Sequence, residues 1–119
     1  MHEFYSPHFR VKTVDNVTVI RLTDTEIRTP SQAEAVGRDL AALIEQIGRG
    51  RYLLDLAKTK YMSSTAFAML FHFAKRVAAA QGQVRICHID PDVRIGANIL
   101  RLGDQIPICD DETTAIESF

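Results

Sequence analysis

The chain has 119 residues, of which 46% are hydrophobic and 24% charged, and its formal net charge is −1 at pH 7. This length suits one domain with a buried core, and the near-neutral charge argues against a surface built for nucleic acid or anionic membranes. No apolar run reaches the roughly 20 residues that cross a bilayer. We therefore expect a globular protein without a nucleic-acid partner and without direct insertion into a membrane.

The chain begins with residues 1–8, which we interpret as a flexible lead-in to a single domain over residues 9–119. Two strand-like runs open that domain, at 9–14 and 17–22. They are joined by Asp15-Asn16, and two turn residues between β-rich runs predict a hairpin. A polar loop follows before the next regular element.

The first helix is marked at both ends. Thr29 can cap it, Pro30 suits its first turn, and Gln32 stands where a capping box places an amide. Gly48 and Gly50 are expected to end it. Between these signals, apolar residues recur at helical spacing: Val36, Leu40, Leu43, Ile44 and Ile47.

The rest of the chain alternates strands with helices. The expected elements are a strand at 52–56, a helix at 64–80 closed by Gly82, a strand at 84–89, a helix from Asp90-Pro91 that ends at Gly103, an edge strand at 106–109 containing Pro107, and a helix at 110–119. The order ββαβαβαβα predicts an α/β fold. Its sheet should be largely parallel with right-handed crossovers, and the opening hairpin makes it mixed.

The two cysteines, Cys87 and Cys109, are far apart in the sequence, and both fall in predicted strands. Such sparse cysteines are typical of reduced thiols and not of a disulfide framework or a zinc site. The first ten residues lack the apolar core of a signal peptide, so we expect a cytoplasmic protein. No cofactor motif is present, and the histidines show no metal-ligand spacing: His2, His8, His72 and His88.

The most informative segment is the hydroxyl cluster Ser63-Ser64-Thr65, which lies between the strand at 52–56 and the helix at 64–80. At such a turn, backbone N–H groups point outward without partners. A serine there is a good helix cap, and a phosphate there would be electrostatically favourable. Both interpretations of these hydroxyls remain open from the sequence.

The amphipathic pattern of this helix centres on Phe67, which should face the sheet. Phe73 falls at the edge of the apolar stripe, and Met69 falls further toward the outside. One interpretation is that these two side chains pack against a neighbouring helix. The other is that they form a partner-binding surface beside Ser64, since exposed methionine and aromatic groups are typical of adaptable interfaces.

This region resembles the STAS domain family, which includes anti-sigma factor antagonists and the cytoplasmic tails of sulfate transporters. The similarity rests on Asp55-Leu56, then Tyr61-Met62, then Ser63-Ser64-Thr65-Ala66-Phe67-Ala68 opening a helix. The strand at 84–87 followed by Asp90-Pro91 adds to it. The resemblance implies a mixed sheet of about five strands with helices mainly on one face.

The resemblance also implies a mechanism. In this family the residue that corresponds to Ser64 is the regulatory phosphoserine, and the partner is an anti-sigma factor that is also a GHKL-type serine kinase. Phosphorylation releases that partner and a phosphatase resets the system. Here Ser63 replaces a frequent aspartate, and Ala66 and Ala68 replace glycines. Ser63 and Thr65 are substitute acceptors.

A partner-binding face around Ser64 follows from the same resemblance. Its expected members are Met62, Ser63, Ser64, Thr65 and Phe67, extended by Met69 and Phe73, with Asp24 contributed by the loop after the second strand. STAS domains often carry an acidic residue in that loop. The simpler interpretation of Asp24 is a solvated loop charge.

Two other functions remain as alternatives. The domain could be a constitutive scaffold, as in stressosome-like assemblies or accessory subunits of lipid transporters, with binding that does not depend on Ser64. It could instead be a small enzyme with Ser64 as nucleophile. The sequence favours the enzyme least, because no G-x-S-x-G motif surrounds Ser64 and no histidine has an evident triad role.

Overall fold

The computed structural model describes residues 4–119. Its strands are β1 (Phe9–Val14), β2 (Val17–Leu22), β3 (Glu26–Ile27), β4 (Arg51–Asp55), β5 (Tyr61–Met62), β6 (Gln83–Cys87) and β7 (Ile108–Cys109). Its helices are α1 (Pro30–Ile47), α2 (Ser64–Ala79), α3 (Pro91–Ile99), the 3-10 helix η1 (Leu102–Asp104) and α4 (Glu112–Glu117). None of the helices in this part of the chain is both long and apolar enough to cross a membrane.

Five strands form one mixed sheet in the order β1-β2-β4-β6-β7. β1 pairs antiparallel with β2, and the remaining neighbours pair in parallel. The hairpin between β1 and β2 is confirmed: Asp15 and Asn16 have φ angles of 49° and 66°, as a tight two-residue turn requires. β7 lies at an edge, as Pro107 predicted, because proline cannot donate a ladder hydrogen bond.

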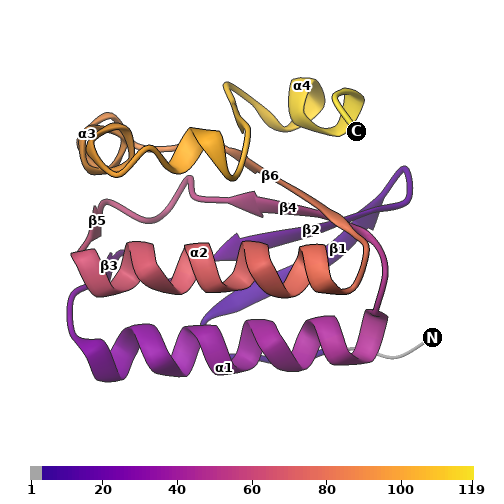
Figure 1. Ribbon diagram of the computed structural model, residues 1–119, viewed down its shortest axis with the longest axis horizontal. Coiled ribbons are helices and arrows are strands. Elements are labelled where there is room, and N and C mark those ends of the chain that lie inside the picture. The colour runs from indigo at the N-terminus through magenta and orange to yellow at the C-terminus, as the bar shows by residue number, and fades with distance from the viewer. Residues whose placement is uncertain (1–3) are drawn as a thin grey trace.

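Helices cover both faces of the sheet unequally (Figure 1). α1 and α2 lie side by side along one face, and the short α4 packs on the other. Alternate strand residues point to the two layers: Ile20 and Leu54 belong to the large core under α1 and α2, whereas Val19 and Leu53 belong to the small core under α4. The α/β architecture with helices mainly on one face is confirmed.

The first helix begins and ends as predicted. Thr29 Oγ1 accepts a hydrogen bond from the backbone N–H of Gln32, and Gly48 ends the helix with φ 76°. Gln32 Oε1 accepts from the backbone N–H of Arg28, one residue before the cap that a standard capping box would use.

Later boundaries differ from the predictions because non-glycine residues adopt left-handed backbone conformations. Gln81, with φ 63°, is the left-handed residue that follows the end of α2. Gly82 has a different role, because the backbone there passes close to Gly50: a Cβ at Gly82 would lie 2.5 Å from the carbonyl oxygen of Gly50. His88 has φ 57° and ends β6 at Cys87, two residues earlier than predicted. Arg101 likewise separates α3 from η1, so the helix predicted to end at Gly103 stops at Ile99.

Two further differences follow from short elements. β3 and β5 pair in parallel as a separate two-stranded sheet, and each has only two residues, too few for a periodic pattern to predict. The last strand starts two residues later than predicted, because only Ile108–Cys109 pair with β6. The last helix is two residues shorter than predicted at each end, since α4 spans Glu112–Glu117.

Residues 4–8 of the predicted lead-in make contacts with the rest of the domain. Ser6 is buried and donates its hydroxyl hydrogen to Asp39 Oδ2 at 2.7 Å, and the ring of Phe4 stacks on Phe9 with centroids 5.8 Å apart. These contacts fix the segment against α1 and β1. The lead-in residues 1–3 lie outside the described part of the chain.

Candidate functional site

The hydroxyl cluster lies where β5 meets the first turn of α2. Ser63 is the N-cap, with extended backbone (φ −75°, ψ 172°), and its Oγ accepts a hydrogen bond from the backbone N–H of Ala66. Ser63 Oγ and Thr65 Oγ1 are also 3.0 Å apart and share a hydrogen bond. The capping interpretation therefore holds for Ser63 alone among the three hydroxyls, because only Ser63 accepts a hydrogen bond from the helix backbone.

Ser64 occupies the first position of α2 and is exposed. Within residues 4–119, no hydrogen bond involves its hydroxyl, and no histidine approaches it as a general base would. Thr65 is exposed as well, but its hydroxyl is paired with that of Ser63, so Ser64 has the one hydroxyl of the three that makes no hydrogen bond within residues 4–119. The first turn of α2 contains no acidic side chain, so the partial positive charge of its N–H groups is not offset there.

The turn before α2 is fastened to the loop after β2. The Ser63 N–H donates to the carbonyl oxygen of Ile27 at 3.0 Å, and the Lys60 N–H donates to that of Thr25 at 2.7 Å. The buried Thr59 hydroxyl donates to the carbonyl oxygen of Asp24 at 2.9 Å. The acidic loop and the serine turn therefore lie together, as the family resemblance implied.

Asp24 itself is not a solvated loop charge. Its carboxylate lies 3.0 Å from Nδ1 of His8 and accepts a longer hydrogen bond, 3.4 Å, from Nε2 of Gln32. Its side chain is only 16% exposed. Asp24 thus joins the start of β1 to α1, and Glu26, two residues on, pairs instead with Arg28 at 2.7 Å.

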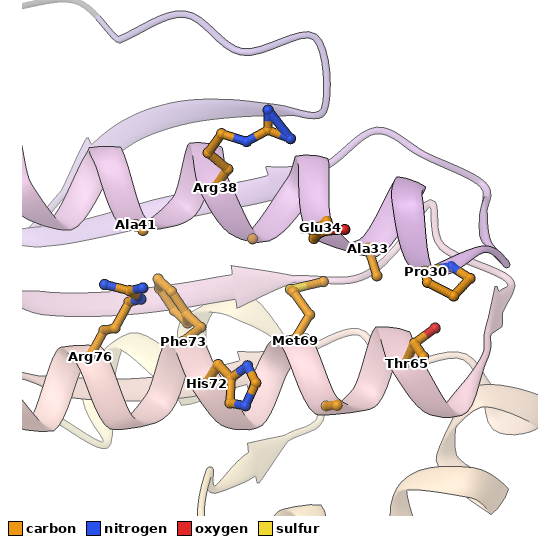
Figure 2. Close-up of a pocket in the computed structure, with 12 residues that line it drawn as sticks. Pro30, Ala33, Glu34, Arg38, Ala41, Thr65, Met69, His72, Phe73 and Arg76 are labelled. Carbon is orange, nitrogen blue, oxygen red and sulfur yellow. The ribbon is translucent and has the colours of Figure 1, made fainter.

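The four large apolar residues expected on the partner-binding face are buried: Met62, Phe67, Met69 and Phe73. Met69 and Phe73 point from α2 toward α1 (Figure 2), so the packing interpretation of these two is correct. Met69, which periodicity placed toward the outside of α2, is covered by α1. Gly37 permits the close approach, since a Cβ at that position would lie 3.0 Å from Met69 Cγ.

A groove of about 530 Å³ runs between α1 and α2 above these buried side chains (Figure 2). Met69 and Phe73 line its floor, and Arg38 and Arg76 stand on opposite helices. Thr65 lines the groove at the start of α2, so the groove opens beside the serine turn.

The sequence reasoning missed an exposed apolar surface on the other side of the turn. Ile95 and Ile99 of α3 are 60% and 75% exposed, and Tyr61 of β5 is 42% exposed with the Arg28 guanidinium over its ring. α3 packs tightly on the first turn of α2, because a Cβ at Gly96 would lie 2.8 Å from the Phe67 ring. The four-residue spacing of Ile95 and Ile99 was the available signal.

A second group of polar residues gathers where β4 and β6 end. The buried Asp55 carboxylate accepts hydrogen bonds from Arg21 Nε at 3.0 Å and from the Ala57 N–H at 2.9 Å, and it lies 3.2 Å from His88 Nδ1. Burial acts to raise the pKa of Asp55, but these hydrogen bonds outweigh it and hold the pKa below its usual value. The carboxylate is therefore ionised at neutral pH.

The two cysteines, distant in sequence, are neighbours in space. Cys87 and Cys109 are register partners on β6 and β7, and both thiols are free. Burial, with a further contribution from the Asp55 charge, raises the pKa of the Cys87 thiol to about 12. Burial thus disfavours the free thiolate form of Cys87 in the folded domain.

Comparison with known proteins identifies the family. The STAS domain model matches residues 8–115, so the chain belongs to the STAS domain family. BtrV of Bordetella bronchiseptica, provisionally named an anti-sigma factor antagonist, is 28% identical over 89 residues, which are 75% of this chain and 76% of BtrV. The resemblance seen in the sequence is confirmed.

Solved structures agree on the fold. A crystal structure of an anti-sigma factor antagonist from Mycobacterium paratuberculosis has a TM-score of 0.80 and 17% identity, covering 95% of this chain and 96% of the other. The phosphorylated form of Bacillus SpoIIAA has a TM-score of 0.65 and 18% identity, covering 92% and 97%. The protein is an anti-sigma factor antagonist-like STAS domain.

Proposed function

We propose that this protein is a cytoplasmic, non-enzymatic regulator that binds an anti-sigma factor with GHKL-type serine kinase activity, and that phosphorylation of Ser64 switches the binding off. One observation carries the proposal: the Ser64 hydroxyl is exposed at the first position of α2, while its neighbours Ser63 and Thr65 bond to each other. A kinase can reach Ser64 without dismantling the helix cap.

Electrostatics support a switch that leaves the fold intact. A phosphate adds a charge of about −1.5 to −2, and the unpaired N–H groups at the start of α2 would stabilise it within the domain. A partner that fits a neutral hydroxyl would have to desolvate or repel that charge. Binding should therefore weaken while the stability of the domain changes little.

The surroundings of Ser64 suit a protein partner. Exposed apolar side chains on α3, Ile95 and Ile99, flank the turn on one side, and the groove that begins at Thr65 flanks it on the other. We propose that Met69 and Phe73 contribute only as the floor of that groove, beneath an inserted side chain of the partner. SpoIIAA, which shares this fold, has been solved in a phosphorylated form.

The test compares baits in lysate of the native organism, followed by mass spectrometry. Wild type and Ser64→Ala should both hold a kinase-like anti-sigma factor, and Ser64→Asp should lose it. Thr113→Asp is the matched control, because it adds the same charge in the first turn of α4 on the opposite face of the sheet and should keep the partner. Equal capture by wild type and Ser64→Asp would refute the switch and favour a constitutive scaffold.

A second arm separates phosphorylation from charge mimicry. The captured kinase, supplied with ATP, should phosphorylate the wild-type protein at one site, and peptide mass spectrometry should place that site at Ser64. Modification of Ser63 or Thr65 in its place would contradict the assignment, since Ser63 is engaged as the helix cap. The Ser64→Ala protein should remain unmodified.

A further inference from the structure

Residues that can ligate a metal ion form a row across three adjacent parallel strands. Asp55 of β4 is the register partner of Cys87 of β6, and Cys87 is in turn the partner of Cys109 of β7. Register partners point to the same face of a sheet, here the face under α4. His88 follows Cys87 directly. The row lies at the carboxyl ends of the strands, where open α/β sheets bind ligands.

We propose that Asp55, Cys87 and His88 form a binding site for a borderline transition-metal ion of the Zn²⁺ class. Their oxygen, sulfur and nitrogen atoms all lie within 4.8 Å of one another. Asp55 Oδ1 is 3.2 Å from His88 Nδ1, and that nitrogen is 3.8 Å from Cys87 Sγ. Tetrahedral zinc, with bonds of about 2.0–2.3 Å, holds its ligand atoms roughly 3.3–3.6 Å apart, close to these separations.

The donor set fits the ion in kind as well as in spacing. Thiolate, imidazole and carboxylate are the three ligand types that zinc accepts, whereas magnesium and calcium prefer oxygen alone. Two of the three side chains, Asp55 and Cys87, are fully buried, and His88 is 37% exposed, which leaves an entry route from solvent. The cluster thus combines two buried donors with a third that reaches solvent.

Asp55 Oδ1 accepts a hydrogen bond from the Ala57 N–H at 2.9 Å, so the metal would use the other lone pair of that oxygen, the one that now faces His88 Nδ1. Arg21 contacts Oδ2 of Asp55, the oxygen that the metal would not use, and would orient the carboxylate from behind. The positive charge of Arg21 would repel the metal ion. When no metal is bound, the same charge neutralises the Asp55 carboxylate. The metal would take the place of the proton between His88 Nδ1 and Asp55 Oδ1, and the neutral imidazole bound through Nδ1 would carry its single proton on Nε2, to which it would pass through solvent.

Cys87 would lose its thiol proton to solvent on binding, since a coordinating thiol is deprotonated by the metal. The nearby Asp55 and Glu112 carboxylates that disfavour a free thiolate favour a cation at the same place. His88 adds a separate indication, because it holds a left-handed backbone conformation, φ 57°, and such strained positions gather at ligand sites.

Titration with Co²⁺, a spectroscopic substitute for zinc, tests the site in the full-length reduced protein without an affinity tag. We expect one equivalent to bind with a thiolate-to-cobalt charge-transfer band that Zn²⁺ then abolishes. His88→Asn should weaken binding at least about a hundredfold, because a ligand is lost, while asparagine tolerates the left-handed backbone. Cys87→Ser should remove the band.

Two controls make the outcome decisive. His72→Asn, on the exposed side of α2, and Cys109→Ser should both keep the band and the affinity. Zn²⁺ should also raise the melting temperature of the wild type by several degrees and leave that of His88→Asn unchanged. A wild type without the band, or a band that survives in Cys87→Ser and disappears in Cys109→Ser, would overturn the assignment. The proposal does not depend on the function assigned to Ser64.

Discussion

Ser63 Oγ accepts a hydrogen bond of 3.3 Å from the backbone N–H of Ala66, so the cap of α2 is the residue before the exposed Ser64. The two adjacent serines consequently have different physical roles. One satisfies an otherwise unpaired donor of the helix, and the other presents a free hydroxyl beside that helix terminus.

The first prediction separates these roles by stability. Ser63→Ala should lower the free energy of unfolding by about 1 kcal/mol, because removing an N-cap hydroxyl leaves the Ala66 N–H without its acceptor. Ser64→Ala should lower it by less than about 0.5 kcal/mol, as for other exposed substitutions. Urea unfolding of both variants measures the difference. Equal losses would show that Ser64 also stabilises the helix.

The second prediction concerns the close approach of Gly82 to β4. Gly82→Ala should destabilise the fold by about 1–3 kcal/mol, because its Cβ would lie 2.5 Å from the Gly50 carbonyl oxygen and the backbone would have to move. Gly103→Ala is the control, since the nearest atom to its Cβ would be 3.9 Å away. Thermal unfolding should show a lower midpoint for Gly82→Ala alone.

The third prediction follows from the buried thiol of Cys87. Burial raises its pKa from the ordinary 9.0 to about 12 in the folded protein. Between these values the unfolded chain releases the proton and the folded chain retains it, so the free energy of unfolding should fall as pH rises from about 9 toward 12. The full shift corresponds to at most about 4 kcal/mol.

Alkaline denaturation of Cys87→Ala isolates this contribution. Its stability curve should be flatter than that of the wild type above about pH 9. Cys109→Ala should keep the wild-type slope, since Cys87 is still present. Parallel curves for the wild type and Cys87→Ala would contradict the raised pKa and point to other titrating groups as the cause of alkaline destabilisation.

The fourth prediction distinguishes surface from core in the proposed partner-binding face. Ile99→Ser should leave the free energy of unfolding within about 0.5 kcal/mol of wild type, because Ile99 is 75% exposed, and should weaken capture of the partner. Phe73→Ala should instead lower stability by about 3–5 kcal/mol, because it empties a core position. Full capture by folded Ile99→Ser would remove α3 from the interface.

The sequence by itself determined the features that depend on neighbours along the chain. Turn chemistry at Asp15-Asn16, the cap at Thr29 and the glycine at Gly48 each act within a few residues, so the hairpin and α1 were predicted to the residue. The alternation of strands with helices fixed the mixed sheet, because parallel strands require crossover connections.

Only the tertiary structure decided which side chains meet. Periodicity placed Met69 outward, but α1 covers it, and no local pattern reports the position of a helix more than twenty residues away. Asp55, Cys87 and His88 come together because parallel strands end at one edge in a particular register. Register depends on pairing between distant segments and on packing of the whole core, which local sequence does not encode.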